Sequence, residues 1–84
     1  MTRDDIAEQY GEDLLFMEPE YFDRAIIGVV HQFTHATVCY DIQKVIAMLM
    51  KHENLTEEEA IEYFDYNIIG SWVGEKTPSF LESL

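Results

Sequence analysis

One nine-residue phrase, Glu-Tyr-Phe-Asp-x-x-Ile-Ile-Gly, occurs twice in this chain, at residues 20–28 and again at residues 62–70. Only its two central positions differ between the copies. In each copy the phenylalanine and the first isoleucine are four residues apart, so on a helix they would share one face. The repeat predicts two similar helical segments that meet across a common core.

The first copy continues into a helical pattern, because Phe22, Ile26, Val29 and Phe33 follow at spacings of four, three and four. We expect a helix over roughly residues 19–33, and the second copy to lie within another helix that reaches about residue 72. A glycine inside a helix costs roughly 1 kcal/mol relative to alanine, and close backbone contact is its usual compensation. The predicted helix-packing residues are therefore Phe22, Ile26, Gly28, Phe64, Ile68, Gly70 and Trp72.

A β-hairpin is the alternative for the middle of the chain, with Ala25–Phe33 paired to Ala36–Tyr40. The many β-branched residues here favour it. A lone two-stranded hairpin is only marginally stable in water, so it would need helix packing or further strands. The preferred fold class is mostly α, a compact bundle of three to four helices with a short extended segment near 36–40. The alternative is an α+β fold with a β-hairpin over residues 25–40.

Local signals mark the other helices. Residues 3–10 can form a short acidic helix, and Asp41 is an N-cap for a helix that carries Lys51 and His52 in its last turn. Thr56 and Glu59 form a capping-box pattern at the start of another. We expect residues 1–84 to form a single domain, with an acidic N-terminal arm over 1–17 and a core over 18–84.

The net charge of −12 is unevenly distributed along the chain. Residues 1–23 hold eight acidic groups against one arginine, a net of −7, and residues 53–84 hold eight against one lysine, also −7. Residues 24–52 hold one acidic group against three basic ones, a net of +2. Direct binding to nucleic acid is disfavoured, because that affinity comes mainly from lysine and arginine. A protein partner with a basic surface, or imitation of nucleic acid, fits this charge; the other reading is that acidity keeps a small protein soluble.

The N-terminus does not resemble a signal peptide, and no apolar stretch approaches the roughly 20 residues needed to span a membrane. The single cysteine, Cys39, excludes an intrachain disulfide and fits a reducing compartment. We therefore expect no membrane association and a cytoplasmic location.

Three candidate metal ligands, His31, His35 and Cys39, are spaced four and four and would form one column on a continuous helix. The neighbouring threonine and valine residues disfavour such a helix, and the paired cysteines of a zinc knuckle are missing. Carboxylates beside the predicted helices have no accompanying nucleophile or phosphate-binding loop. The sequence thus predicts no cofactor and no catalytic residues.

Exposed aromatic residues beside acidic ones suit a protein partner, and Tyr63 and Tyr66 lie off the main apolar stripe of their helix. The same residues are equally ordinary as half-buried core. The candidate interaction residues are Asp4, Asp5, Glu57, Glu58, Glu62, Tyr63 and Tyr66.

From Phe22 to Pro78 the chain resembles a group of small uncharacterised proteins encoded by phages and bacteria. Four blocks carry the resemblance: Asp23-x-Ala25-Ile26-Ile27-Gly28, Val38-x-Tyr40-Asp41, Lys44-Val45-Ile46 and Glu58-Glu59-Ala60. A fifth and more specific block is Phe64-x-x-Asn67-Ile68-Ile69-Gly70-x-Trp72-Val73-Gly74-Glu75-x-Thr77-Pro78. The resemblance covers about two-thirds of the chain and leaves out the acidic arm. It implies a phage-type accessory protein in the cytoplasm of a bacterial host, and it carries over no catalytic residues.

The leading functional hypothesis is a non-enzymatic accessory protein that binds a host or viral protein, with nucleic-acid mimicry as one form of that binding. One alternative is a structural homo-oligomer, of which a homodimer is the simplest form. Another is a small metal-dependent enzyme.

Overall fold

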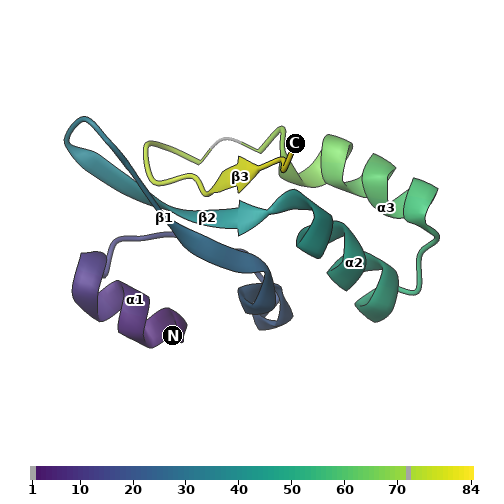
Figure 1. Cartoon of the computed structure of the whole chain (residues 1–84), viewed down its shortest axis with the longest axis horizontal. Helices are drawn as coiled ribbons and strands as arrows, with labels where there is room; N and C mark the ends of the chain where they lie inside the picture. The colour runs from purple at the N-terminus through teal and green to yellow at the C-terminus, as the bar shows by residue number, and fades with distance from the viewer. Residues whose placement is uncertain (1, 72) are drawn as a thin grey trace.

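The computed structural model describes residues 2–71 and 73–84 and places helices beside a three-stranded sheet, an α+β arrangement (Figure 1). The expected mostly helical bundle is therefore wrong, and the alternative β-hairpin is what forms. The sheet order is β1-β2-β3. No helix within the described residues is long and apolar enough to cross a membrane.

The hairpin consists of β1 (Ile26–Gln32) and β2 (His35–Asp41), which pair antiparallel across the two-residue turn Phe33-Thr34. Of the predicted helix over 19–33, only a short 3₁₀ helix, η1 (Glu20–Ala25), remains. The β-branched residues of β1 lose side-chain freedom in a helix but fit a pleated strand. The helical spacing was an ambiguous signal, and pairing with β2 decided it.

Strand β2 is central, because β3 (Ser79–Leu81) pairs with it in parallel on the side away from β1. The hydroxyls of Thr37 and Ser79 lie 2.6 Å apart and link these strands through their side chains as well. Residues 37–40 are all buried, which explains the unbroken run of apolar and small residues there. The extended segment predicted near 36–40 is thus confirmed.

The hydrophobic core lies on the face of the sheet that carries Val38 and Tyr40. Helix α1 (Arg3–Tyr10) contributes Ile6, and the segment after it contributes Leu14. The acidic arm therefore packs into the same core as the rest of the chain. The buried members of this core are Ile6, Leu14, Phe22, Ala25, Val38, Tyr40, Val45, Leu49, Ala60 and Phe64.

Polar anchors hold the irregular segment between α1 and η1. The Tyr40 hydroxyl accepts a hydrogen bond from the Met17 amide at 2.8 Å, and burial of Tyr40 raises its pKa to about 12. The Arg3 guanidinium donates to both carboxylate oxygens of Asp23, at 2.6 and 2.8 Å, and to Glu18 at 2.8 Å. These hydrogen bonds hold the pKa of Arg3 above its usual value, and the bond to Asp23 is the strongest cause. Such a bidentate pair fixes geometry as well as distance.

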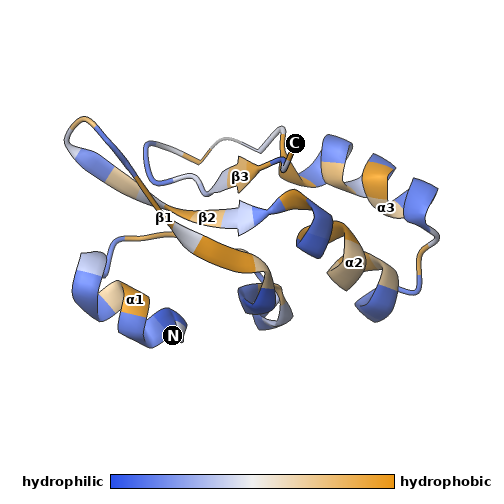
Figure 2. Cartoon of the chain, in the orientation of Figure 1, coloured by the Kyte–Doolittle hydropathy of each residue, from blue (hydrophilic) through white to orange (hydrophobic). Residues whose placement is uncertain are grey.

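The predicted starts of the remaining helices are confirmed. The Asp41 carboxylate accepts from the Lys44 amide at 3.0 Å and caps α2 (Ile42–His52). Thr56 and Glu59 form the capping box of α3 (Glu57–Tyr63), which continues directly into a π-helix, η2 (Phe64–Ile68). Helical structure therefore ends before residue 72. Figure 2 shows polar residues on much of α1 and at the start of α3, and hydrophobic ones in the middle of β2 and the first half of β1.

The two copies of the repeated phrase adopt different structures, the first a 3₁₀ helix followed by a strand and the second a helix. Phe22 and Phe64 are buried core residues as predicted, and their isoleucine partners Ile26 and Ile68 are half-buried. Trp72 lies outside the described residues.

The predicted close helix contact at the two glycines is wrong. Both Gly28 and Gly70 are exposed, and they lie in a strand and in a turn. A Cβ at Gly28 would meet nothing within 4 Å, and one at Gly70 would meet only the Asp65 carbonyl at 3.8 Å.

We expect Gly28→Val to leave the free energy of unfolding unchanged or to raise it by up to about 1 kcal/mol, because glycine weakens a strand interior. The control is Gly11→Ala, where φ is +126° and the new Cβ would lie 2.8 Å from Asp13 Oδ1; it should destabilise. Urea unfolding at low protein concentration measures both. A Gly28→Val variant less stable than Gly11→Ala would contradict this assignment.

Candidate functional site

The outer side of α3 and η2 collects most of the predicted interaction residues. Ala60 and Phe64 face the core, and the opposite side of the same helical segment is exposed. We call these exposed residues the α3 surface: Glu57, Glu58, Glu62, Tyr63 and Tyr66.

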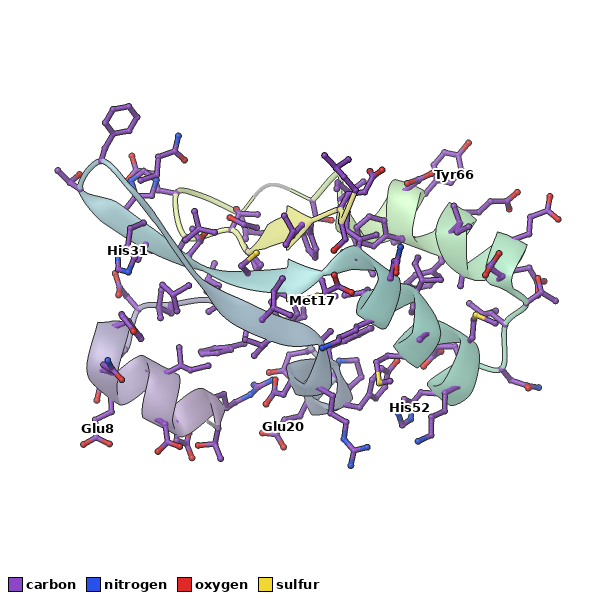
Figure 3. The ribbon with its side chains drawn as sticks, in the orientation of Figure 1. Glu8, Met17, Glu20, His31, His52 and Tyr66 are labelled. Carbon is purple, nitrogen blue, oxygen red and sulfur yellow. The ribbon has the colours of Figure 1, made fainter. Side chains whose placement is uncertain are left out.

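Aromatic exposure distinguishes this surface. Tyr66 is 84% exposed and Tyr63 is 43% exposed. Figure 3 shows Tyr66 projecting from the helix away from the rest of the chain. Ile61 and Ile69 on the same segment are 44% and 50% exposed. The structure thus answers the question that the sequence left open for Tyr66, which is surface and not core.

The carboxylates of the α3 surface have no cationic partner within the described residues. The ion pairs among the described residues lie elsewhere: Arg3 pairs with Glu18, Glu20 and Asp23, and Lys76 pairs with Asp13. Helix α3 carries acidic residues in its first turn and no basic residue in its last. Carboxylates without nearby positive charges create a negative potential, which attracts cations and basic surfaces.

The other predicted interaction residues, Asp4 and Asp5, do not belong to this surface. They lie in α1, and α1 and α3 are at opposite ends of the long axis (Figure 1). Asp5 also has a local task, because its carboxylate accepts from the Thr2 amide at 3.0 Å in a capping box. That hydrogen bond is the main cause of its lowered pKa. The structure therefore divides the predicted acidic site into two separate surfaces.

A groove between α2 and α3 adjoins the α3 surface, with a volume of about 560 Å³. The sequence pattern did not predict it, because no candidate interaction residue was expected at Ile61. Ala60 and Ile61 are adjacent and so point about 100° apart on a helix. That adjacency was the available signal that one of them stays outside. The groove is lined by Ile42, Gln43, Ile46, Glu57, Ile61 and Glu82.

The column of His31, His35 and Cys39 does not form, because these residues lie on the hairpin and not on a helix. His31 is paired with Ala36, next to Val29–Val38, whereas His35 and Cys39 alternate onto the other face. Along residues 2–71 and 73–84, no three histidine, cysteine or acidic side chains are grouped as metal ligands would be.

Cys39 is buried, and burial is the main cause that raises the pKa of its thiol. A thiol held protonated is a poor nucleophile. Cys39 is therefore a poor candidate for a catalytic nucleophile in this geometry.

Comparison with protein-family models, with curated proteins and with solved structures gave no match. The functional proposals below rest on the chain's own surfaces.

The capping box of α3 predicts a pH-dependent contribution to stability. The Thr56 amide donates to Glu59 at 2.9 Å, and this bond is the main cause that lowers the pKa of Glu59. A carboxyl whose pKa is lowered by folding stabilises the protein above its unfolded pKa, and this contribution is lost as the pH falls through the folded pKa.

We therefore expect Glu59→Gln to be less stable than the parent chain near pH 7, and the difference to shrink as the pH falls through the lowered pKa of Glu59 and to vanish below it. Thermal unfolding across this range measures it. A difference that stays constant with pH would contradict the role given to the Glu59 charge.

Proposed function

We propose that this chain is a non-enzymatic accessory protein, of phage type and acting in the bacterial cytoplasm, that binds a basic surface of a host or viral protein through the α3 surface. The observation that carries the proposal is the exposure of Tyr66 beside Glu62 and Glu58, which have no cationic partner in the described structure.

An exposed tyrosine contributes a large, stiff contact area, and tyrosine is common among the residues that dominate binding energy at interfaces. The surrounding carboxylates act differently. They steer a basic partner during encounter and set its orientation, with an effect that salt screens. The α3 surface combines both kinds of residue on a helix whose inner side is fixed by the core.

The groove between α2 and α3 extends this surface. Its lining includes three isoleucines, Ile42, Ile46 and Ile61, and two glutamates, Glu57 and Glu82. Lysine and arginine bury an apolar stem while the charged end stays in water. A basic side chain can therefore place its stem on the isoleucines and its charge beside a carboxylate.

Imitation of nucleic acid is a particular form of the same proposal. It applies if the partner's basic surface normally holds DNA or RNA, since phosphate groups and carboxylates attract the same lysine and arginine side chains. Double-stranded DNA would then displace the chain from its partner, which distinguishes mimicry from binding elsewhere on the partner.

Two charge-reversed variants test the role of the α3 surface with equal changes in net charge. Glu58→Lys/Glu62→Lys alters the α3 surface, and Asp4→Lys/Glu8→Lys alters exposed residues of α1 at the other end of the molecule. Each chain is used as bait in expressing or infected bacteria, and the dissociation constant of each captured protein is then measured at two salt concentrations.

We expect the α3 variant to weaken binding at least tenfold and the α1 variant to weaken it less than about threefold, with the parent affinity falling as salt rises. A partner that binds all three chains equally, or that is lost only with the α1 variant, would overturn the proposal.

The homo-oligomer alternative is favoured by a separate observation, the exposed edge and tip of the hairpin. The hairpin tip lies at the end of the molecule opposite α3 (Figure 1).

A further inference from the structure

Phe33, at the tip of the hairpin, is unusual in two independent ways. Its side chain is 94% exposed, and its backbone has a φ of +54°. It is the first central residue of a two-residue hairpin turn, a position with positive φ that glycine or asparagine usually occupies. A bulky residue there costs conformational free energy, and its exposed ring gains no burial. Burial of the ring against another molecule would offset the backbone cost and remove the apolar ring from water.

Strand β1, next to this tip, is an edge strand whose own sequence lacks the residues that usually block further pairing. It spans seven residues, Ile26–Gln32, and contains no Asp, Glu, Lys, Arg or Pro. Within the described residues only β2 pairs with it. Ile27 and Val30 are 42% and 37% exposed. Natural edge strands usually carry charge, proline or a cover that prevents further pairing. An uncharged edge in a chain of net charge −12 stands out as a place where a strand can add.

A recess lies beside the other end of β1, between this strand and α1. We call it the β1 recess, and its volume is about 260 Å³. That exceeds the roughly 150 Å³ in which a benzene molecule is held inside a protein. It is lined by Ile6, Tyr10, Asp23, Ile26, Ile27, Gly28 and Val29.

The exposed ring of Phe33 and the β1 recess are at opposite ends of the same strand. Ile27, which lines the recess, is six residues from Phe33, or about 20 Å along an extended chain at 3.3 Å per residue. If two copies of β1 pair antiparallel about a two-fold axis near Val29 and Val30, residue 33 of each copy comes opposite residues 25–27 of the other. Of these, Ile26 and Ile27 line the β1 recess. The surface is therefore complementary to itself, and the arrangement closes after two copies.

We propose that the chain forms a homodimer in which the two β1 strands pair antiparallel and each Phe33 enters the β1 recess of the other copy. The sheet then continues across the dimer as six strands. The α3 surfaces remain free, since α3 lies at the end of the molecule opposite the hairpin tip (Figure 1).

The charge distribution makes a second copy the fitting occupant of this edge. Strand β1 contains no Asp, Glu, Lys or Arg, so two paired copies of it bring none of these charges directly opposite each other. Local repulsion at the paired strands is therefore small. The two whole chains still repel at long range, so screening by salt should strengthen the dimer. Binding of a basic partner to the α3 surface has the opposite salt dependence.

Sedimentation equilibrium of the full chain over a range of concentrations, at low and high salt, tests the dimer. Phe33→Gly removes the ring and relieves the positive φ, so the monomer should fold at least as well as the parent. Val30→Lys places two like charges near the two-fold axis, where they oppose pairing. Val73→Lys is the matched control, since Val73 is 64% exposed and lies outside the hairpin.

We expect the parent chain to dimerise more tightly at high salt, Phe33→Gly and Val30→Lys to raise the dissociation constant at least tenfold, and Val73→Lys to behave as the parent. A parent chain that stays monomeric at all concentrations overturns the proposal. A dimer that persists in both hairpin variants also overturns it, and so does a dimer that Val73→Lys weakens as much as the hairpin variants do.

Phe33→Asn, which also tolerates positive φ, replaces Phe33→Gly if circular dichroism shows that the glycine variant is unfolded. The α3 proposal is unaffected by any of these outcomes, because its variants lie elsewhere.

Discussion

The fold depends on the burial of Tyr40 in the central strand. Its side chain is completely buried, it contacts Phe80 of the neighbouring strand with ring centres 6.0 Å apart, and its hydroxyl accepts the Met17 amide. One residue thereby joins β2, β3 and the irregular segment that leads from α1 to η1. A buried amide left without a partner costs about 1–3 kcal/mol, so this hydrogen bond also fixes the course of that segment. The ion pair of Arg3 with Asp23 joins α1, which precedes this segment, to η1, which follows it.

In the described structure, two exposed surfaces that do not pack on the core lie at opposite ends of the molecule. One is the outer side of α3, where acidic residues surround Tyr66. The other is the free edge of β1 with Phe33 at its tip. The charge distribution separates them as well, since α3 lies in a segment of net charge −7 and β1 contains no Asp, Glu, Lys or Arg. An acidic surface with exposed tyrosines suits a basic partner, and an uncharged strand edge suits another strand. The two proposals therefore call on different physical interactions.

Local signals in the sequence predicted the helix starts correctly, because the caps at Asp41 and Thr56 depend only on residues three positions away. Residues 26–33 were mispredicted, because Phe22, Ile26, Val29 and Phe33 fit a helical stripe while the long-range partners that decide the matter are not visible in a local pattern. Strand β3, about 40 residues further along the chain, completes the sheet. The same error placed Phe33 in the core. The sequence placed the tyrosines of the α3 surface off the apolar stripe but left surface and core equally open for them, whereas the separation of Asp4 and Asp5 from α3 depends on the tertiary fold.

Residue-resolved amide hydrogen exchange along residues 22–33, at several protein concentrations, tests the central claim that this segment is a sheet edge. In the dilute monomer every second amide of β1 should exchange slowly, because it bonds to β2, while the intervening amides exchange fast. Raising the concentration should then slow the intervening amides. Similar protection of consecutive amides from Phe22 to Phe33 at every concentration, as a helix would give, would contradict both the hairpin and the surfaces derived from it.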